Sequence, residues 1–348
     1  MKLLVTGGCG FIGSAVIRKA IEMDANVVNL DALTYAANLD NVKSVERHPN
    51  YKFIKLNICD RESLEQVFRD EQPDRVMHLA AESHVDRSID SPSSFISTNI
   101  FGTFNMLQTS LEYWRSEKAP SSFLFHHIST DEVYGSLPED PEVKFVETTA
   151  YQPRSPYSAS KAGSDHLVRA WHETYGLPTV ITNCSNNYGP YHHPEKLIPS
   201  VILKALGGEP IPIYGSGQQI RDWLHVEDHA DALLTVVKHA GPGTTYNIGG
   251  CNEYTNLQVV TKICDQLDMI YPSVNGSYKD QIIFVADRPG HDARYAIDAT
   301  QINNELGWKP KILFDEGLRM TIMWFLENRE WSHNTLKNFN LNQRLGSL

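Results

Sequence analysis

Tyr157 and Lys161 are the first pair of residues whose types and spacing can do chemistry. They lie four positions apart within residues 155–161, where Ser155 is a good helix N-cap and Pro156 suits the first helical position. We therefore expect a helix that carries both side chains on one face. There the Lys161 ammonium would lower the pKa of the Tyr157 phenol and make it a base at neutral pH. Taken alone, this spacing is also common in surface pairs.

A second candidate set, Thr130, Asp131 and Glu132, follows a predicted strand at residues 122–128. Side chains at the carboxyl ends of strands face the ligand in doubly wound sheets. Thr130 can hydrogen-bond a substrate hydroxyl, while Asp131 and Glu132 offer an acid and a base, which a redox step alone does not need. The alternative is a solvated acidic turn, which the position at a strand end makes less favourable.

Three glycines, Gly7, Gly10 and Gly13, follow the first predicted strand and open a predicted helix. Gly7 allows a tight turn, Gly10 lets the backbone approach a pyrophosphate, and Gly13 permits close packing of helix on strand. The helix N-terminus then turns its free N–H groups toward the phosphates. Asp31 ends the second strand, where it can bind the adenosine ribose and would repel the 2′-phosphate of NADP. The pattern predicts an NAD site.

Asp60 follows the third predicted strand and has two interpretations. It can face the adenine edge of the cofactor, or it can cap the helix predicted at residues 61–72. The sequence favours neither.

The elements that must position these residues alternate between short apolar runs and helical patterns. We expect strands at residues 2–5, 26–30, 51–56, 75–79, 122–128 and 179–183, and helices at residues 13–23, 61–72, 98–114 and 159–175. The strands are continuously apolar, as in parallel sheets that are covered on both faces. The predicted fold is therefore α/β, with a Rossmann-type doubly wound parallel sheet.

After residue 185 proline and glycine become frequent and helices are separated by longer irregular segments. We expect residues 1–185 to form an NAD-binding domain that carries the catalytic residues. Residues 186–348 are expected to form a smaller mixed α/β lobe that mainly binds substrate. Because no clear linker separates them, the chain can cross between the lobes more than once.

Composition excludes several classes of protein. A formal charge of −11 argues against binding to nucleic acid or to an anionic membrane. The five cysteines are widely spread, and neither their spacing nor that of His84, His192 and His193 indicates a metal site. No apolar run reaches transmembrane length, so we expect a cytoplasmic protein.

With the glycine loop, the Tyr157/Lys161 pair and the 130–132 triplet, the chain resembles the extended short-chain dehydrogenases over nearly its full length. Within that family it is most similar to enzymes that remove water from nucleotide sugars. Further similar stretches are residues 31–35, 80–88, 186–191, 194–199, 221–226 and 287–292. Ala37 and His193 depart from the family pattern, which affects at most substrate fit or loop geometry.

The resemblance implies functional residues by position. Catalytic positions fall on Thr130, Asp131, Glu132, Tyr157 and Lys161. Cofactor positions fall on Gly7, Gly10, Phe11, Ile12, Gly13, Asp31, Leu33, Thr34, Ile58, Asp60, Leu79, Ala80, Ala81, Ser83, Thr98, Tyr157 and Lys161. Substrate positions fall on Ser83, His84, Thr130, Asn186, Glu195, Lys196, Leu197, Pro212, Tyr214, Arg221, Asn256, Arg288, His291 and Tyr295. Of these, Arg221 and Arg288 are the expected diphosphate ligands, because a guanidinium can pair with two phosphate oxygens; a structural salt bridge is the alternative for either.

The implied reaction converts dTDP-glucose to dTDP-4-keto-6-deoxyglucose and water, with Glu132 as the base at C5 and Asp131 as the acid at the 6-hydroxyl. Adjacent carboxyl groups with opposite tasks need different pKa values. The resemblance also implies a tightly bound, recycled NAD and a homodimer that pairs through residues 98–114 and 159–175. The alternatives are a sugar-nucleotide epimerase or decarboxylase on the same scaffold, which would not require both carboxyl groups, and a noncatalytic NAD-binding protein, which would not need Tyr157 and Lys161.

Overall fold

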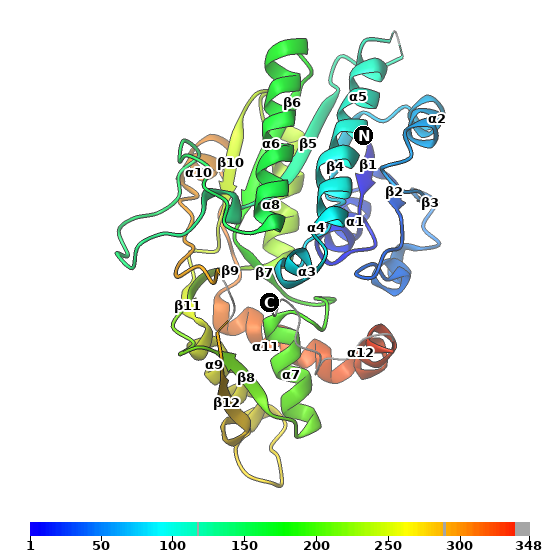
Figure 1. Cartoon of the computed structure of the whole chain (residues 1–348). Helices are drawn as coiled ribbons and strands as arrows, with labels where there is room; N and C mark the ends of the chain where they lie inside the picture. The colour runs from blue at the N-terminus through cyan, green and yellow to red at the C-terminus, as the bar shows by residue number, and fades with distance from the viewer. Residues whose placement is uncertain (117, 288–289, 338–348) are drawn as a thin grey trace.

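The computed structural model describes residues 1–116, 118–287 and 290–337 and shows a larger lobe above a smaller one (Figure 1). The larger lobe is built on a seven-stranded sheet in the order β10-β6-β5-β4-β1-β2-β3, and every pair in it is parallel. Its strands are β1 (Lys2–Thr6), β2 (Asn26–Asp31), β3 (Tyr51–Lys55), β4 (Arg75–His78), β5 (Leu124–Thr130), β6 (Thr179–Cys184) and β10 (Thr245–Ile248). The α/β fold with a parallel Rossmann-type sheet is confirmed.

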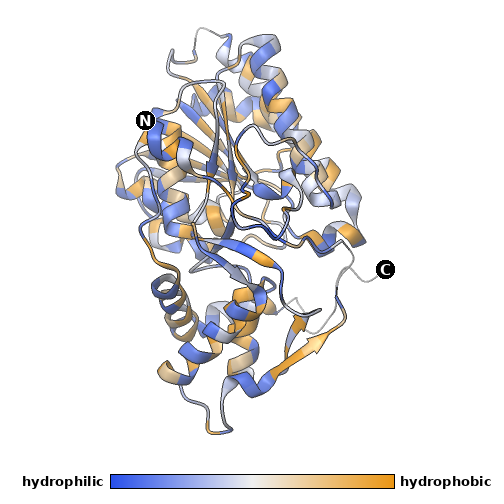
Figure 2. Cartoon of the chain, turned by 90° about the vertical axis from the view of Figure 1, so that its left-hand side faces the viewer, coloured by the Kyte–Doolittle hydropathy of each residue, from blue (hydrophilic) through white to orange (hydrophobic). Residues whose placement is uncertain are grey.

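Helices cover both faces of this sheet. The helices are α1 (Phe11–Glu22) and α8 (Val226–His239) on one face, and α2 (Arg61–Glu71), α5 (Thr103–Trp114) and α6 (Pro156–Tyr175) on the other. Leu3 and Val5 of β1 join the core beneath α1 and α8, whereas Leu4 joins the opposite core. Because successive side chains alternate between two buried faces, the strands are apolar throughout. The helices carry both hydrophobic and hydrophilic residues (Figure 2).

The start of α6 is fixed by local sequence. Ser155 Oγ accepts from the Ser158 backbone N–H at 3.0 Å, and Ser158 Oγ accepts from the Ser155 N–H at 3.0 Å. This reciprocal capping, with Pro156 at the first helical position, confirms the predicted helix start and orients Tyr157 and Lys161.

The segment before α5 is helical as well, but with irregular turns. It runs through α3 (Val85–Asp90), α4 (Pro92–Phe95) and a π-helix, η2 (Ile96–Gly102). The helix predicted at residues 98–114 therefore divides into η2 and α5. Two 3₁₀ helices, η1 (Leu39–Val45) and η3 (Asp131–Tyr134), follow β2 and β5.

The chain returns to the large sheet after residue 185, because β10 pairs with β6 and α8 packs on α1. Sequence patterns did not indicate β10, which is a four-residue strand at the edge. Helix α10 (Thr300–Leu306) contacts β10.

The smaller lobe has two small sheets and its own apolar core. Its strands are β7 (Asn186–Tyr188), β8 (Ile211–Tyr214), β9 (Ile220–His225), β11 (Glu253–Thr255) and β12 (Ile282–Val285). Its helices are α7 (Leu197–Gly207), α9 (Asn256–Ile270), η4 (Tyr278–Gln281), α11 (Phe314–Glu327) and α12 (Arg329–Leu336). In the part of the chain that the structure describes, no helix is long and apolar enough to cross a membrane.

Candidate active site

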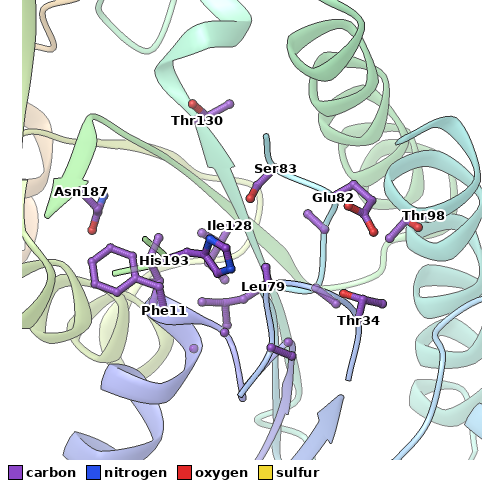
Figure 3. A pocket seen from close by; sticks show the side chains of 18 of the residues that line it. Phe11, Thr34, Leu79, Glu82, Ser83, Thr98, Ile128, Thr130, Asn187 and His193 are labelled. Atoms are coloured by element: carbon purple, nitrogen blue, oxygen red, sulfur yellow. The ribbon is translucent and has the colours of Figure 1, made fainter. Parts of the chain in front are cut away.

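A cavity of about 370 Å³ lies at the carboxyl ends of the large sheet's strands, against the start of the smaller lobe. Figure 3 shows Phe11 and His193 on one side of it, Thr34, Glu82 and Thr98 on the other, and Leu79 and Ile128 between them. Thr130 lies farther along, at the end of β5. This is where doubly wound sheets bind their ligands.

The glycine loop forms one end of the cavity with geometry that only glycine allows. Gly7 has φ +72°, and a Cβ there would lie 2.8 Å from the backbone of Ala80. A Cβ on Gly13 would lie 2.2 Å from the Gly7 carbonyl oxygen, so Gly13 is required for α1 to pack this closely. Helix α1 begins at this loop without a side-chain cap, which leaves its N–H groups for an anion. The loop fits a dinucleotide pyrophosphate.

Asp31 is fastened to this loop at the end of β2. Its carboxylate accepts from the backbone N–H groups of Cys9 and Leu33, each at 2.8 Å. Burial raises the pKa of the Asp31 carboxyl, and these two hydrogen bonds act against that rise. The residue lines the cavity, as binding to the adenosine ribose would require.

Two predicted cofactor residues do not line the cavity. Asp60 is exposed and caps α2, accepting from the Ser63 backbone N–H at 3.2 Å. Of its two interpretations, the geometry therefore favours the helix cap. Leu33 contributes its N–H to Asp31, while its side chain packs against the apolar core. The remaining predicted cofactor residues all line the cavity: Gly7, Gly10, Phe11, Ile12, Gly13, Asp31, Thr34, Ile58, Leu79, Ala80, Ala81, Ser83, Thr98, Tyr157 and Lys161.

Tyr157 and Lys161 both reach the cavity from α6. Lys161 is buried, and its Nζ donates to the Ile128 carbonyl of β5 at 2.8 Å. That bond ties the ammonium to the strand that ends in Thr130. Burial lowers the pKa of Lys161, although the nearby Asp165 carboxylate opposes the effect.

The expected lowering of the Tyr157 pKa is not what the protein chain alone produces. Burial and the charge of Glu132 raise the pKa of the phenol well above its usual value, while a hydrogen bond from Thr130 acts in the opposite direction. Burial destabilises a phenolate, and the neighbouring Glu132 carboxylate destabilises it further. The protein chain alone thus favours the protonated phenol, and positive charge in the cavity would favour the phenolate.

The triplet at the end of β5 separates its two carboxyl groups. Thr130 Oγ1 accepts from the Glu132 backbone N–H at 3.3 Å and so caps η3. Glu132 lines the cavity, whereas Asp131 is 2% exposed and lies behind the lining. One oxygen of Asp131, Oδ2, is buried without a hydrogen-bond partner among the described residues.

This environment makes Asp131 a candidate acid. Burial, followed by the charges of Glu132 and Asp222, raises the pKa of Asp131 well above its usual value. The raised pKa favours the protonated form of the group, as an acid role requires. The solvated acidic turn is excluded for Asp131.

Some of the predicted substrate residues line the cavity, and most of the others lie in the smaller lobe. Six line the cavity: Ser83, Thr130, Asn186, Glu195, Lys196 and Leu197. Outside the lining lie His84, Pro212, Tyr214, Arg221, Asn256, His291 and Tyr295, and Arg288 lies outside the described residues.

Arg221 nevertheless lies near the acidic pair. It stacks over the Tyr295 ring at 4.2 Å and donates to the Asp292 carbonyl at 2.9 Å. The Arg221 charge lowers the pKa of Asp131, against the larger effect of burial. Burial and then the Glu132 charge raise the pKa of Tyr295. Residues 292–295 therefore lie near the end of β5.

Glu195 is held by neighbours as well as lining the cavity. It accepts from Arg87 Nε and Nη2, both at 3.1 Å, and the Arg87 guanidinium stacks over the Tyr35 ring at 4.2 Å. His84 Nε2 lies 3.8 Å from the same carboxylate. Residues 80–88 and residues 194–199, both predicted to bind ligand, are thus joined by the Arg87–Glu195 ion pair.

Sequence reasoning missed several cavity residues, among them Glu82, Cys184, Asn187, His192 and His193 as ligand contacts. His192 stacks on Phe11 with ring centroids 4.3 Å apart, and burial lowers the pKa of His193 to about 3. Glu82 and Asn187 adjoin predicted site residues, Cys184 ends β6, and His192 and His193 lie within three positions of Glu195; this proximity is the signal that could have found them. Among the described residues no group of three or more His, Cys, Asp or Glu side chains is placed to hold a metal ion.

Comparison with known proteins gives matches over nearly the whole chain. The family model for GDP-mannose 4,6 dehydratase matches residues 4–321. A dTDP-glucose 4,6-dehydratase of Salmonella typhimurium is 59% identical over 344 residues, covering 96% of this chain and 95% of that protein. One from Neisseria meningitidis is 56% identical over 352 residues, covering 99% of each. The solved structure of DesIV, a dTDP-glucose 4,6-dehydratase from Streptomyces venezuelae with NAD and TYD bound, matches with TM-score 0.89 and 41% identity, covering 96% of this chain and 100% of that one.

Proposed function

The chain belongs to the dTDP-glucose 4,6-dehydratase family, and from this premise we propose that it converts dTDP-glucose to dTDP-4-keto-6-deoxyglucose and water. It is an NAD-dependent hydro-lyase. The observation that carries the proposal is the pair of consecutive carboxyl groups at the end of β5, with Asp131 buried and Glu132 in the cavity beside Tyr157.

A bound NAD would supply the hydride acceptor for C4 of the sugar and the hydride donor for C6. Tyr157 removes the proton of the 4-hydroxyl, so that a ketone forms at C4. The Lys161 ammonium, and the positive charge that an oxidised nicotinamide would bring, would favour the phenolate form of Tyr157. The loop of Gly7 and Gly10, against which Gly13 lets α1 pack closely, would hold the pyrophosphate, and Asp31 would hold the ribose.

The ketone makes the C5 proton acidic, and Glu132 removes it. Asp131 donates its proton to the 6-hydroxyl, which leaves as water. The raised pKa of Asp131 suits this acid role, because it favours the protonated form of the group. Thr130 positions the sugar by a hydrogen bond to a hydroxyl.

The nucleotide end of the substrate is assigned to the smaller lobe. Arg221 is the proposed diphosphate ligand together with Arg288, and Tyr214 is the proposed partner of the base. Asn186, Lys196, Asn256 and His291 are proposed contacts of the sugar or the phosphates. The protein is proposed to act in the cytoplasm as a homodimer, with NAD retained between turnovers, in the synthesis of a deoxysugar.

The test is to incubate the purified protein with dTDP-glucose without added cofactor and to analyse the product by mass spectrometry. We expect a 4-keto-6-deoxy product that has lost one water. A product of unchanged mass with inverted C4 would instead show an epimerase, and loss of carbon dioxide from a uronic acid analogue would show a decarboxylase.

A further inference from the structure

Asp165 is a buried carboxylate that none of the proposed chemical steps uses. It lies one turn after Lys161 on α6 and is fully buried. Ser129 Oγ and Tyr151 OH each donate to its Oδ2 at 2.9 Å, and Asn183 Nδ2 donates to the same oxygen at 3.3 Å. A carboxylate with this many donors is stabilised in its ionised form.

His127 of β5 supplies a further donor to Asp165 and lies beside Lys161. Its Nε2 is 3.1 Å from Asp165 Oδ1 and 3.4 Å from Lys161 Nζ. Its Nδ1 is buried without a hydrogen-bond partner among the described residues. A proton on Nδ1 would therefore have no acceptor, so the favoured tautomer carries the proton on Nε2 and donates it to Asp165.

We infer that Asp165 is a positioning residue for the reaction: its buried negative charge, reached across the edge of His127, keeps the Lys161 ammonium charged and in place beside Tyr157. Lys161 needs such a counter-charge because a buried ammonium without a partner loses its proton. The inference rests on the proposed role of Lys161 in the dehydratase reaction.

The charged and titratable groups around the two residues agree with this assignment. Burial lowers the pKa of Lys161, and the charge of Asp165 is the strongest influence that raises it. The Lys161 ammonium in turn helps to lower the pKa of His78 on β4. No other carboxylate acts on the Lys161 pKa as strongly as Asp165 does.

The surroundings of Asp165 act in the same sense. His127 and Lys161 both lower the pKa of the Asp165 carboxyl, against the effect of burial. Tyr151, which donates to Asp165, accepts from Arg169 at 3.0 Å, and the Asp165 charge also raises the pKa of the nearby Tyr134. Asp165 is therefore ionised, and the Lys161 charge, one turn earlier on α6, acts on its pKa.

The first test compares the pH dependence of kcat for Asp165→Asn and Tyr151→Phe. Asp165→Asn removes the charge but keeps the shape, so Lys161 deprotonates at lower pH and the alkaline limb moves down by about one pH unit or more. Tyr151→Phe removes one hydrogen bond from the same carboxylate and keeps its charge, so the limb stays in place. An unmoved limb in Asp165→Asn, or an equal movement in both variants, overturns the inference.

The second test needs no activity and so separates this inference from the proposed function. We compare urea midpoints of the wild type, Lys161→Met, Asp165→Asn and the double variant. Lys161→Met leaves the buried Asp165 carboxylate without its cation. In that background Asp165→Asn should lower the urea midpoint less than it does in the wild-type background, or raise it. Equal lowering in both backgrounds contradicts the coupling. If Asp165→Asn alone is insoluble, a soluble double variant supports the inference and an insoluble one overturns it.

Discussion

Asp131 and Glu132 are consecutive residues whose carboxyl groups lie in different environments. Asp131 is 2% exposed with a raised pKa, whereas Glu132 lines the cavity and its N–H is bonded to Thr130. The 3₁₀ turn of η3 produces this division, because it directs neighbouring side chains away from each other. One strand end thus supplies both an acid and a base.

Glu132→Gln should stop the proton transfer at C5 while leaving the oxidation at C4 intact. An amide cannot accept the C5 proton, and loss of a general base costs roughly 10²- to 10⁴-fold in rate. The measurement is exchange of the C5 hydrogen with deuterated solvent, alongside the absorbance of reduced cofactor. Exchange at the native rate would assign the base elsewhere.

Asp131→Asn is the matched variant for the acid. It keeps the size of the side chain but provides no transferable acidic proton, so C5 exchange should continue while release of water falls. If this variant loses exchange and dehydration to the same degree, the two carboxyl groups do not divide the work in the proposed way.

Asp31→Ala should release the cofactor. The change removes the proposed ribose ligand and leaves the N–H groups of Cys9 and Leu33 unpaired, which costs roughly 1–3 kcal/mol of stability for a buried group. NAD content of the purified protein is the measurement, after acid release of the nucleotide. The control is Asp60→Ala, which should lower the melting temperature by removing the cap of α2 but leave NAD content unchanged. A loss of NAD in the Asp60 variant would restore the adenine-facing interpretation.

Buried histidines should make the fold sensitive to acid. Burial lowers the pKa of His126 to about 3 and that of His127 to about 4, so both are neutral in the folded chain. In the unfolded chain both histidines bind a proton below about pH 6.5. The free energy of unfolding that they contribute above this pH is therefore lost as the pH falls toward their pKa values in the folded chain.

His126→Gln isolates one of these contributions. The raised pKa of Asp131 acts in the opposite direction, so the wild-type slope alone does not identify the histidine. Glutamine can keep a hydrogen bond to Thr182, which His126 Nε2 makes at 3.0 Å. The free energy of unfolding of this variant should then fall less between about pH 7 and pH 5 than that of the wild type. An equal fall in both proteins would show that His126 does not contribute to the acid sensitivity.

Phe101→Glu should weaken the proposed homodimer. Phe101 is 60% exposed on η2, within the segment expected to pair with a second copy. A charge at the centre of an apolar interface is costly to bury. Light scattering after size exclusion measures the mass. Phe284→Glu, at an equally exposed residue of β12, is the control and should leave the mass unchanged. A dimer that survives Phe101→Glu contradicts pairing through this segment.

Sequence alone predicted the features that depend on local order. The start of α6 follows from Ser155 and Pro156, and the glycine loop follows from the spacing of its glycines. Six strands of the large sheet were predicted within a few residues of their observed bounds. These features need only neighbouring residues, and the alternation of helix and strand then determines the parallel sheet.

Features that depend on tertiary contact were not predictable. The edge strand β10 is short, and its pairing with β6 joins residues more than sixty positions apart. The stacking of Arg221 on Tyr295 joins different segments in the same way. The direction of the Tyr157 pKa depends on burial and on Glu132, which the spacing of Tyr157 and Lys161 does not contain. For Asp60, the hydrogen bond to Ser63 and its position outside the cavity lining distinguished a helix cap from a cofactor ligand.

The central claim is that one site moves a hydride within a single sugar and expels water between the two transfers. The most direct test supplies dTDP-glucose carrying deuterium at C4, mixed with unlabelled substrate, to the protein without added NAD. We predict a 4-keto-6-deoxy product in which the deuterium has moved to C6 of the same molecule. Deuterium that stays at C4 of a dehydrated product, or that is scattered into unlabelled molecules, would contradict the account.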